Sequence, residues 1–288
     1  MGSRISTEFR EINLQDRAWM ERCRDPERNP FTALSFPSLF TWRIAYGLEV
    51  AGNEEAFVVR SRQDQACFCP CGTEAGCREL MEALTENEKH MRVVYLTEEQ
   101  ADAWAKQGFT VRLREDLSEY LASADAVALR AGHMSKSFKE KCRHFKRDIR
   151  YEVSPVYNGN IDKVIALAER LRNDEKEEKM GDIEVVMSEI ESFRKLDLRG
   201  LLLETDDGRV GFIFGYENRP GMFTMSMAKH DRGLPAETTA VLIHELTKQI
   251  VPQYSLINLE EDLGLPGLRR AKMLFSPVGK LEVYEAAR

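Results

Sequence analysis

The stretch that most constrains this chain lies near its C-terminus, where an apolar run ends abruptly in charge. Residues 256–259 are apolar apart from Asn258. Three carboxylates follow directly: Glu260, Glu261 and Asp262. Pro266 then opens a short basic segment, and proline fits the first turn of a helix. The pattern predicts a strand-to-helix junction with three acids at its tip. Acids at a helix start also compensate the helix macrodipole, so a purely structural role stays open.

The residues before this junction predict a second strand and a long helix. Met222–Lys229 is a largely apolar run, and a polar loop at 231–235 separates it from a helical pattern at Pro235–Ile250. The strand Ser255–Leu259 follows that helix. Two short strands that flank one helix are typical of a parallel crossover unit. Asp207-Gly208 lies upstream between two apolar runs and predicts the tight turn of a hairpin.

Three segments of the chain resemble a bacterial protein family. They are residues 36–43 (Phe-Pro-Ser-Leu-Phe-Thr-Trp-Arg), the basic run from Leu129 to Phe145, and residues 258–278, which begin Asn-Leu-Glu-Glu-Asp-Leu-Gly-Leu-Pro and end Ser-Pro-Val. They are similar to a family related to the C-terminal domain of phosphatidylglycerol lysyltransferase. The resemblance implies an α+β chain with mixed sheets, built from two tandem GNAT-like acyltransferase domains.

Length and composition agree with a two-domain globular protein. With 288 residues and 43% apolar residues, each half can bury a core of its own. We expect an abbreviated N-terminal GNAT-like domain at 1–128 and a C-terminal domain carrying the site at 129–288. No apolar run approaches the roughly 18 residues of a membrane span, so no integral membrane segment and a cytoplasmic location are expected.

Charge is unevenly placed along the chain. Residues 129–150 hold eight Lys or Arg against two acids, which is a local charge of +6. Because the net charge of the chain is −7, the remaining residues together carry a charge of −13. Ser137 with Glu140 predicts a capping box for a helix in this stretch, and its apolar positions form a narrow stripe. Four outward cations are candidates to hold an anionic donor: Lys139, Arg143, Lys146 and Arg147. A merely solvated basic face is the alternative.

The six cysteines predict no metal site. Cys67, Cys69 and Cys71 are separated by single residues, unlike the spacing of zinc knuckles. Alternate residues of a strand share one face, so we interpret these cysteines as small buried side chains. The cluster at 174–179 is nearly all charged and predicts an exposed helix end or a lid.

The loop before the long helix predicts an anion site. Free N–H groups at a helix start attract phosphate, and the segment holds six candidates to bind the donor: Met227, Ala228, Lys229, Arg232, Gly233 and Ala236. GNAT enzymes typically carry Gln/Arg-x-x-Gly-x-Gly/Ala here to cradle coenzyme A. This loop departs from that spacing, and Pro235 removes one N–H donor. His230 ends the strand beside the loop and is a candidate acid or base.

Transfer of an acyl group to an amine needs a base and stabilisation of the carbonyl oxygen. Glu260, Glu261 and Asp262 are the candidate bases, alternatively the groups that bind the substrate amine. Arg269 and Lys272 are the nearest predicted cations and either pair with these acids or hold a phosphate.

These patterns leave two functional hypotheses. The first is an acyl- or aminoacyl-transferase that uses a coenzyme A thioester or an aminoacyl-tRNA as donor, without a metal, and an amine or hydroxyl as acceptor. The basic helix suits the phosphates of tRNA. The second is a catalytically silent GNAT-like module that binds an anionic small molecule or a partner.

Overall fold

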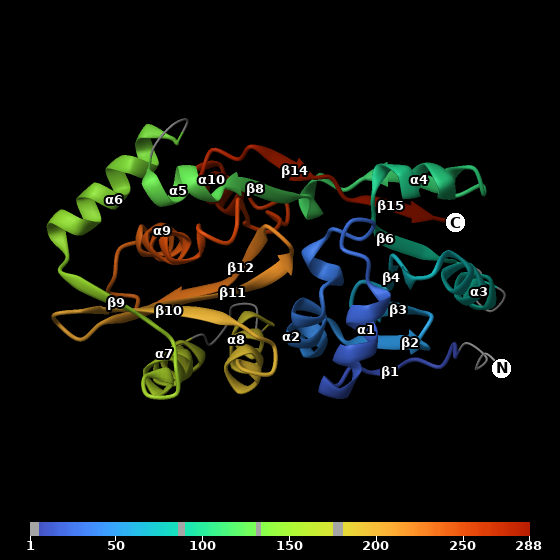
Figure 1. Cartoon of the computed structure of the whole chain (residues 1–288), viewed down its shortest axis with the longest axis horizontal. Helices are drawn as coiled ribbons and strands as arrows, with labels where there is room; N and C mark the ends of the chain where they lie inside the picture. Colours follow the sequence, from blue (N-terminus) through green and yellow to red (C-terminus); the bar gives the residue numbers. More distant parts are fainter. Residues whose placement is uncertain (1–5, 86–89, 131–133, 175–180) are drawn as a thin grey trace. The chain divides into compact units, whose positions relative to one another are not determined.

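The structure, a computed structural model, describes residues 6–85, 90–130, 134–174 and 181–288 (Figure 1). The chain divides into two compact units: Met1–Leu117 with Leu281–Arg288, and Ser118–Lys280. The predicted boundary near residue 128 differs from this division. Residues 119–123 form a strand that pairs inside the second sheet, and the C-terminal strand pairs inside the first. The expected α+β class with two mixed sheets is confirmed.

The first unit is built on an eight-stranded mixed sheet in the order β1-β2-β3-β4-β6-β15-β7, with β5 paired to β3. Its strands are β1 Arg10–Glu11, β2 Leu48–Gly52, β3 Ala56–Ser61, β4 Ala66–Phe68, β5 Cys71–Gly72, β6 Arg92–Leu96, β7 Thr110–Leu113 and β15 Tyr284–Ala287. Its helices are α1 Arg17–Cys23, α2 Phe36–Tyr46, α3 Glu74–Thr85 and α4 Glu98–Ala105.

Local signals in the first unit act as their residue types predict. The capping box of α4 has Thr97 Oγ1 accepting from the Gln100 N–H at 3.3 Å and Gln100 Oε1 accepting from the Thr97 N–H at 2.9 Å. Cys67, Cys69 and Cys71 are buried side chains on and beside β4 and β5. Among the described residues, no group of three or more His, Cys, Asp or Glu is placed to hold a metal ion.

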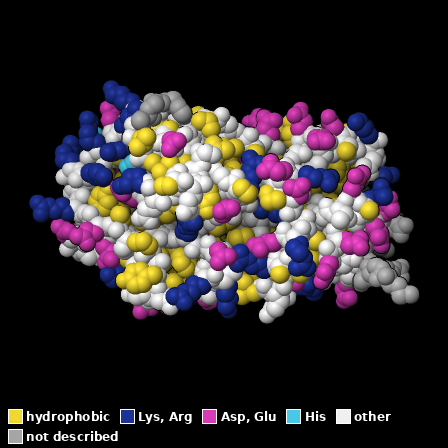
Figure 2. Space-filling model, viewed as in Figure 1, with side chains coloured by type: hydrophobic (Ala, Val, Ile, Leu, Met, Phe, Trp, Pro, Cys, Tyr) yellow, Lys and Arg dark blue, Asp and Glu magenta, His cyan; other side chains and the backbone are white. Residues whose placement is uncertain are grey.

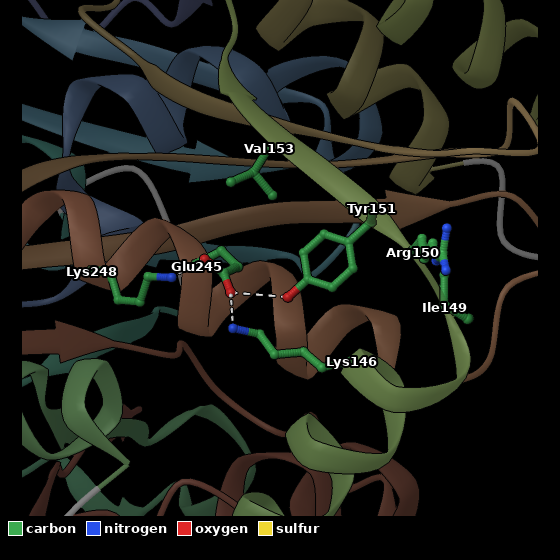
Figure 3. A pocket seen from close by; sticks show the side chains of 7 residues that line it. All are labelled: Lys146, Ile149, Arg150, Tyr151, Val153, Glu245 and Lys248. Carbon is green, nitrogen blue, oxygen red and sulfur yellow. Dashed lines mark hydrogen bonds and ion pairs between the residues drawn. The ribbon is translucent and has the colours of Figure 1, made fainter.

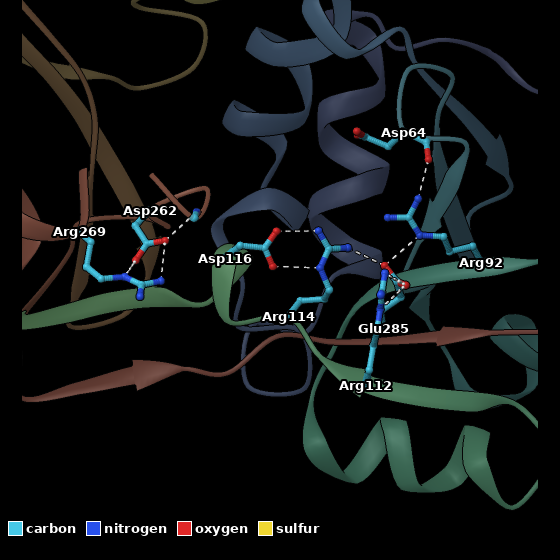
Figure 4. Close-up of polar contacts among 9 residues, drawn as sticks. Asp64, Arg92, Arg112, Arg114, Asp116, Asp262, Arg269 and Glu285 are labelled. Atoms are coloured by element: carbon cyan, nitrogen blue, oxygen red, sulfur yellow. Dashed lines mark hydrogen bonds and ion pairs between the residues drawn. The ribbon is translucent and has the colours of Figure 1, made fainter. Parts of the chain in front are cut away.

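The last strand of the chain is held in the first unit by one buried carboxylate (Figure 4). Glu285 is 3% exposed and accepts hydrogen bonds from Arg92 at 2.9 Å, Arg112 at 3.0 Å and Arg114 at 2.6 Å. Burial opposes the charge, yet the guanidinium groups of Arg92 and Arg114 hold the pKa of Glu285 below its usual value. The ion cluster therefore fixes β15 between β6 and β7.

The second unit is built on a seven-stranded sheet in the order β14-β8-β13-β12-β11-β10-β9. Its strands are β8 Glu119–Ser123, β9 Tyr151–Pro155, β10 Arg199–Thr205, β11 Val210–Arg219, β12 Met222–His230, β13 Leu256–Asn258 and β14 Gly279–Leu281. Its helices are α5 Ala124–Leu129, α6 Lys136–Asp148, α7 Ile161–Asp174, α8 Gly181–Ser192, α9 Thr238–Ile250 and α10 Pro266–Met273. The predicted hairpin is β10 and β11, joined at Asp207-Gly208.

Helices cover both faces of this sheet (Figure 1). Leu201, Leu203 and Ile213 pack in one core with residues of α5, α6 and α9. Because successive strand residues point to opposite faces, Phe214 lies on the other face, where its ring contacts Phe193 after α8 at a centroid distance of 5.2 Å. The helices α7 and α8 cover that face.

The basic helix α6 docks through a buried stripe. Phe138, Cys142 and Phe145 are at most 3% exposed, and burying each Phe stabilises the fold by roughly 1.5–3 kcal/mol. The capping box expected from Ser137 and Glu140 is wrong, because Ser135 is the N-cap and its hydroxyl accepts from the Phe138 N–H at 3.1 Å.

The predicted parallel crossover is confirmed by β12, α9 and β13. Its strands pair in parallel register over residues 222–224 and 256–258. The charged segment expected as an exposed end or lid lies, from residue 175 on, outside the described residues. No helix in the described part of the chain is both long and apolar enough to cross a membrane.

Candidate active site

The two strands of the crossover part after three residue pairs. Register between β12 and β13 ends at Thr224 and Asn258, while β12 continues to His230. On its other edge β12 shifts register against β11, because Met225 pairs with Gly215 and Ala228 pairs with Ile213. One extra residue in β12 makes a β-bulge, which turns side chains and backbone groups away from the regular pleat. The bulge lies where β12 has left β13.

A buried carboxylate from α8 meets this bulge. Glu189 is 2% exposed, and its Oε1 accepts a hydrogen bond from the Ser226 hydroxyl at 2.6 Å. Its Oε2 has no hydrogen-bond partner among the described residues. Burial raises the pKa of Glu189 to about 8, although the Ser226 hydrogen bond lowers it. Such a carboxyl group exchanges a proton near neutral pH, which is a property of general bases.

Glu260 joins the same cluster of charges. Its side chain is half-buried, and burial together with the neighbouring carboxylates Glu261, Glu119 and Glu189 raises its pKa well above the usual value. Its backbone has φ = +61°, a left-handed conformation that non-glycine residues rarely adopt. The Glu260 N–H donates to Asn258 Oδ1 at 2.7 Å, and its carbonyl accepts from the Tyr120 N–H at 3.1 Å.

Lys272 supplies a cation to this cluster from α10. Its ammonium group donates to the carbonyl oxygen of Leu259. Burial lowers the pKa of Lys272, and the charges of Glu260 and Glu261 oppose that shift. Lys272 is thus a cation beside Glu260, Glu261 and Glu119, and it is itself partly desolvated.

Asp262 has a different environment from its two neighbours (Figure 4). Its carboxylate is buried and accepts from Tyr120 Oη at 2.6 Å, Arg269 Nε at 2.7 Å and the Gly264 N–H at 2.8 Å. Figure 4 shows the contact with Arg269. Burial opposes ionisation, but these three donors hold the pKa of Asp262 at about 2. A carboxylate of such low pKa is a weak proton acceptor, so Asp262 and Arg269 serve to fix the loop after β13.

The residues of the expected anion loop are spread over several environments. Three of them are exposed: Arg232, Gly233 and Ala236. Arg209 donates to the Gly233 carbonyl, and α9 begins at Thr238 rather than at Pro235. Lys229 pairs with Asp182 of α8 at 3.2 Å.

The other three candidate residues of β12 contact the core or the backbone. Met227 is buried, and Ala228 packs against the core. His230 Nδ1 lies 3.0 Å from the Asp231 carbonyl oxygen. Ser226, a residue not predicted from the sequence, joins this strand to Glu189 by a hydrogen bond.

The cations of α6 are partly paired. Lys141 binds Glu237 at 2.9 Å, and Lys146 lies 3.5 Å from Glu245. Arg147 pairs with the adjacent Asp148 at 2.6 Å, whereas Lys139 and Arg143 have no ion-pair partner among the residues that the structure describes. Figure 2 shows Lys and Arg side chains gathered over this end of the unit. The helix therefore retains a positive outer face.

Glu189, like Ser226, is a site residue that the sequence patterns did not predict. The position of Glu189 in the sequence could have indicated its burial, because it lies three residues after the buried Val186 and four before Phe193, on the apolar face of α8. A glutamate at a core-facing helix position is rarely buried without a partner.

Comparisons with known proteins agree with this architecture. The family model "Phosphatidylglycerol lysyltransferase, C-terminal" matches residues 29–287. A conserved protein of unknown function from Bacteroides thetaiotaomicron is 25% identical, with a TM-score of 0.82 and coverage of 97% of this chain and 98% of that chain. L-PGS from Bacillus licheniformis is 13% identical, with a TM-score of 0.67 and coverage of 96% and 92%.

FemX is 8% identical, with a TM-score of 0.62 and coverage of 97% of both chains. The likeness to L-PGS and to FemX shows the fold alone. A comparison with curated proteins finds no match.

Proposed function

Because this chain belongs to the phosphatidylglycerol lysyltransferase C-terminal family, we propose that it transfers an aminoacyl group from a tRNA ester to an amine or hydroxyl acceptor. One observation carries the proposal. The buried Glu189 carboxylate holds Ser226 in the β12 bulge with one oxygen and leaves the other unpartnered among the described residues.

Glu189 is the proposed general base. With a pKa of about 8, its ionised form takes the proton of an amine or hydroxyl as that group attacks the ester carbonyl. A new C–N or C–O bond forms, the ester C–O bond breaks, and the ribose oxygen leaves with a proton. The pKa lies close enough to neutral pH for the same group to return a proton to the leaving oxygen.

The bulge supports stabilisation of the developing oxyanion. Beyond Thr224 the edge of β12 that faces β13 is no longer paired with it, so backbone N–H groups there are available to a substrate carbonyl. Fixed N–H donors aimed at a carbonyl oxygen typically contribute a factor of about 10²–10³ to the rate. Lys272, which is partly desolvated, is a second proposed source of positive charge.

The carboxylates favour a cationic aminoacyl group. Glu119, Glu189 and Glu261 each lie within electrostatic reach of Glu260, and a lysyl group carries two ammonium groups that such a cluster attracts. We therefore propose lysyl as the transferred group, with Glu260 and Glu261 as its binding residues. The outward cations of α6 suit the phosphates of the donor tRNA.

A coenzyme A thioester is the second candidate donor. The loop Arg232–Ala236 keeps an Arg, a Gly and an Ala of the acyltransferase pattern. However, the spacing of these residues departs from the pattern, and Pro235 lacks an N–H for the pyrophosphate. These features favour the tRNA ester over the thioester.

Transfer of radiolabelled lysine tests this proposal. The full chain is incubated with lysyl-tRNA or, separately, with acetyl-coenzyme A, and label is followed into soluble amines, glycerol-containing hydroxyl acceptors and phosphatidylglycerol vesicles. We expect transfer from lysyl-tRNA, and Glu189→Gln to lower kcat by a factor of about 10²–10⁴.

Glu191→Gln is the matched control, because Glu191 is exposed on the same helix and the change removes the same charge. It should retain activity within about twofold. Full activity of the Glu189→Gln variant would exclude Glu189 as base. Absence of transfer from both donors would favour a catalytically silent binding module.

A further inference from the structure

A cavity lies on the face of the second sheet that is opposite α8. Its volume is ≈ 380 Å³, and it lies between the end of α6, the start of β9 and α9 (Figure 3). Its lining residues are Lys146, Ile149, Arg150, Tyr151, Val153, Glu245 and Lys248. Of these, only Lys146 was singled out from the sequence as a candidate. The size falls within the usual range of small-molecule sites.

A buried carboxylate organises the cations of this cavity. Glu245 is 3% exposed and accepts a hydrogen bond from the Tyr151 hydroxyl at 3.0 Å. Lys146 lies 3.5 Å from it, and Lys248 forms an ion pair with it. Figure 3 shows the two lysines approaching Glu245 from different sides. Glu245 therefore positions two ammonium groups that would otherwise repel each other.

The two lysines remain accessible. The side chains of Lys146 and Lys248 are 43% and 42% exposed, against 4% for Glu245. Each ammonium group has three N–H donors, so donors remain after the contact with Glu245. Glu245 thus holds both ammonium groups on their buried side, and their solvent-exposed side remains accessible to a ligand.

The cavity carries an excess of positive charge. Three cations, Lys146, Arg150 and Lys248, line it together with one carboxylate, and Arg150 lies beyond Tyr151 from that carboxylate (Figure 3). Arg150 has no ion-pair partner in the described part of the chain, and its guanidinium fork suits two oxygens of a phosphate. A concave surface lined by cations concentrates anions. The charge therefore indicates a phosphorylated ligand.

The remaining wall is apolar. Ile149 and Val153 line the cavity next to the ring of Tyr151, which is itself held by Phe145 in an edge-on contact with a centroid distance of 5.3 Å. A wall of this kind accepts the flat face of a nucleobase, while the cations take the phosphate. We propose that this cavity is a nucleotide-phosphate binding site, occupied either by a free nucleotide or by a nucleotide of an RNA chain.

Binding to the full chain tests this proposal without requiring any transfer reaction. Calorimetric titrations use three probes: inorganic phosphate, AMP and a single-stranded RNA oligonucleotide of about 12 nucleotides. Arg150→Ala and Lys146→Ala are compared with the unsubstituted protein. Lys136→Ala is the matched control, because Lys136 lies on the same helix outside the cavity and its side chain is 89% exposed.

We expect AMP or RNA to bind in a salt-sensitive manner. Arg150→Ala and Lys146→Ala should each weaken binding at least about tenfold, and Lys136→Ala less than about twofold. Binding of AMP alone identifies a free nucleotide as the occupant, and binding of RNA alone identifies a nucleotide within a chain. The proposal is overturned by binding of inorganic phosphate alone, by equal effects of Arg150→Ala and Lys136→Ala, or by no binding of any probe.

Discussion

Ser226 donates a hydrogen bond of 2.6 Å to Glu189 and thereby joins the β12 bulge to the buried face of α8. The two residues are far apart in the sequence, and their contact accounts for the hydrogen bonding of both side chains. The bulge turns Ser226 out of the regular pleat. Its hydroxyl donates to Glu189 and partly offsets the rise in the pKa of Glu189 that burial causes. This pair therefore places a titratable group at the point where β12 and β13 part.

The pH dependence of stability should reflect Glu189. Its folded pKa of about 8 lies above the ordinary 4.5, so its contribution to stability is complete below the ordinary pKa and is lost as pH rises towards 8. The loss approaches about 1.4 kcal/mol per pH unit in that window. Urea unfolding followed by far-UV circular dichroism at pH 5 and pH 8 should show that Glu189→Gln reduces this slope. An unchanged slope would mean that Glu189 titrates normally.

The pH profile of transfer should depend on Ser226. Its hydroxyl stabilises the ionised form of Glu189, so Ser226→Ala should raise the pKa of Glu189 further. Ionisation of the base then requires a higher pH, and the acidic limb of kcat/KM should shift upward. Ser226→Thr keeps the hydroxyl and should restore the midpoint. If both variants retain the original midpoint, the titrating base is another group.

Glu260 stores backbone strain beside the proposed site. A non-glycine residue at φ = +61° costs on the order of 1–2 kcal/mol, and glycine adopts this conformation without that cost. Glu260→Gly should therefore raise the melting temperature while impairing lysyl transfer. Glu261→Gly is the control, because it removes a neighbouring carboxylate at a residue without positive φ and should lower stability by roughly 0.5–1 kcal/mol. Equal losses of stability in both variants would contradict the strain.

The thiols should react slowly in the folded protein. Burial raises the pKa of Cys69 to about 12 and that of Cys77 to about 11, and among the six cysteines only Cys77 is not fully buried. Because the thiolate is the reactive form, Cys77 should react about a hundredfold more slowly than a thiol of ordinary pKa. Mass spectrometry after labelling at pH 8 should find Cys77 modified first. Rapid native labelling of Cys69 would contradict the buried placement.

Local signals in the sequence were sufficient for much of this fold. The crossover of β12, α9 and β13 could be predicted, because strand length, helix length and the loop residues are all encoded within the segment itself. The apolar stripe of α6 was equally clear. Its cap was placed two residues late, because Ser135 and Ser137 both fit the pattern and only tertiary contacts decide between them.

Long-range relationships could not be predicted in the same way. The four residues of β15 pair with β6 and β7, about 170 to 195 positions away, and so short an element contains little information on its register. The adjacent acids Glu260 and Asp262 also acquire opposite pKa shifts. Arg269 and Tyr120 lower the pKa of Asp262. Burial and then the carboxylates Glu261, Glu119 and Glu189 raise the pKa of Glu260, and spacing along the chain does not reveal this burial.

The position of β15 leads to a stability prediction for the first unit. Glu285→Ala removes the acceptor shared by Arg92, Arg112 and Arg114, and of these Arg114 alone keeps an ion pair among the described residues, with Asp116 at 2.7 Å. Loss of one partner of a fully buried ion pair costs about 3–5 kcal/mol, and the partial exposure of the arginines reduces the expected cost to about 2–3 kcal/mol.

Tryptophan fluorescence can measure this effect in the first unit, because Trp19, Trp42 and Trp104 all lie there and the second unit contains no tryptophan. Glu282→Ala is the matched control, since Glu282 is exposed on the same C-terminal segment. Because the pKa of Glu285 is lowered, its stabilisation is present above the ordinary glutamate value and is lost as pH falls through the folded pKa. The difference between the two variants should therefore be large at pH 7 and shrink under acid conditions, and a constant difference would place the stabilisation in packing rather than in charge.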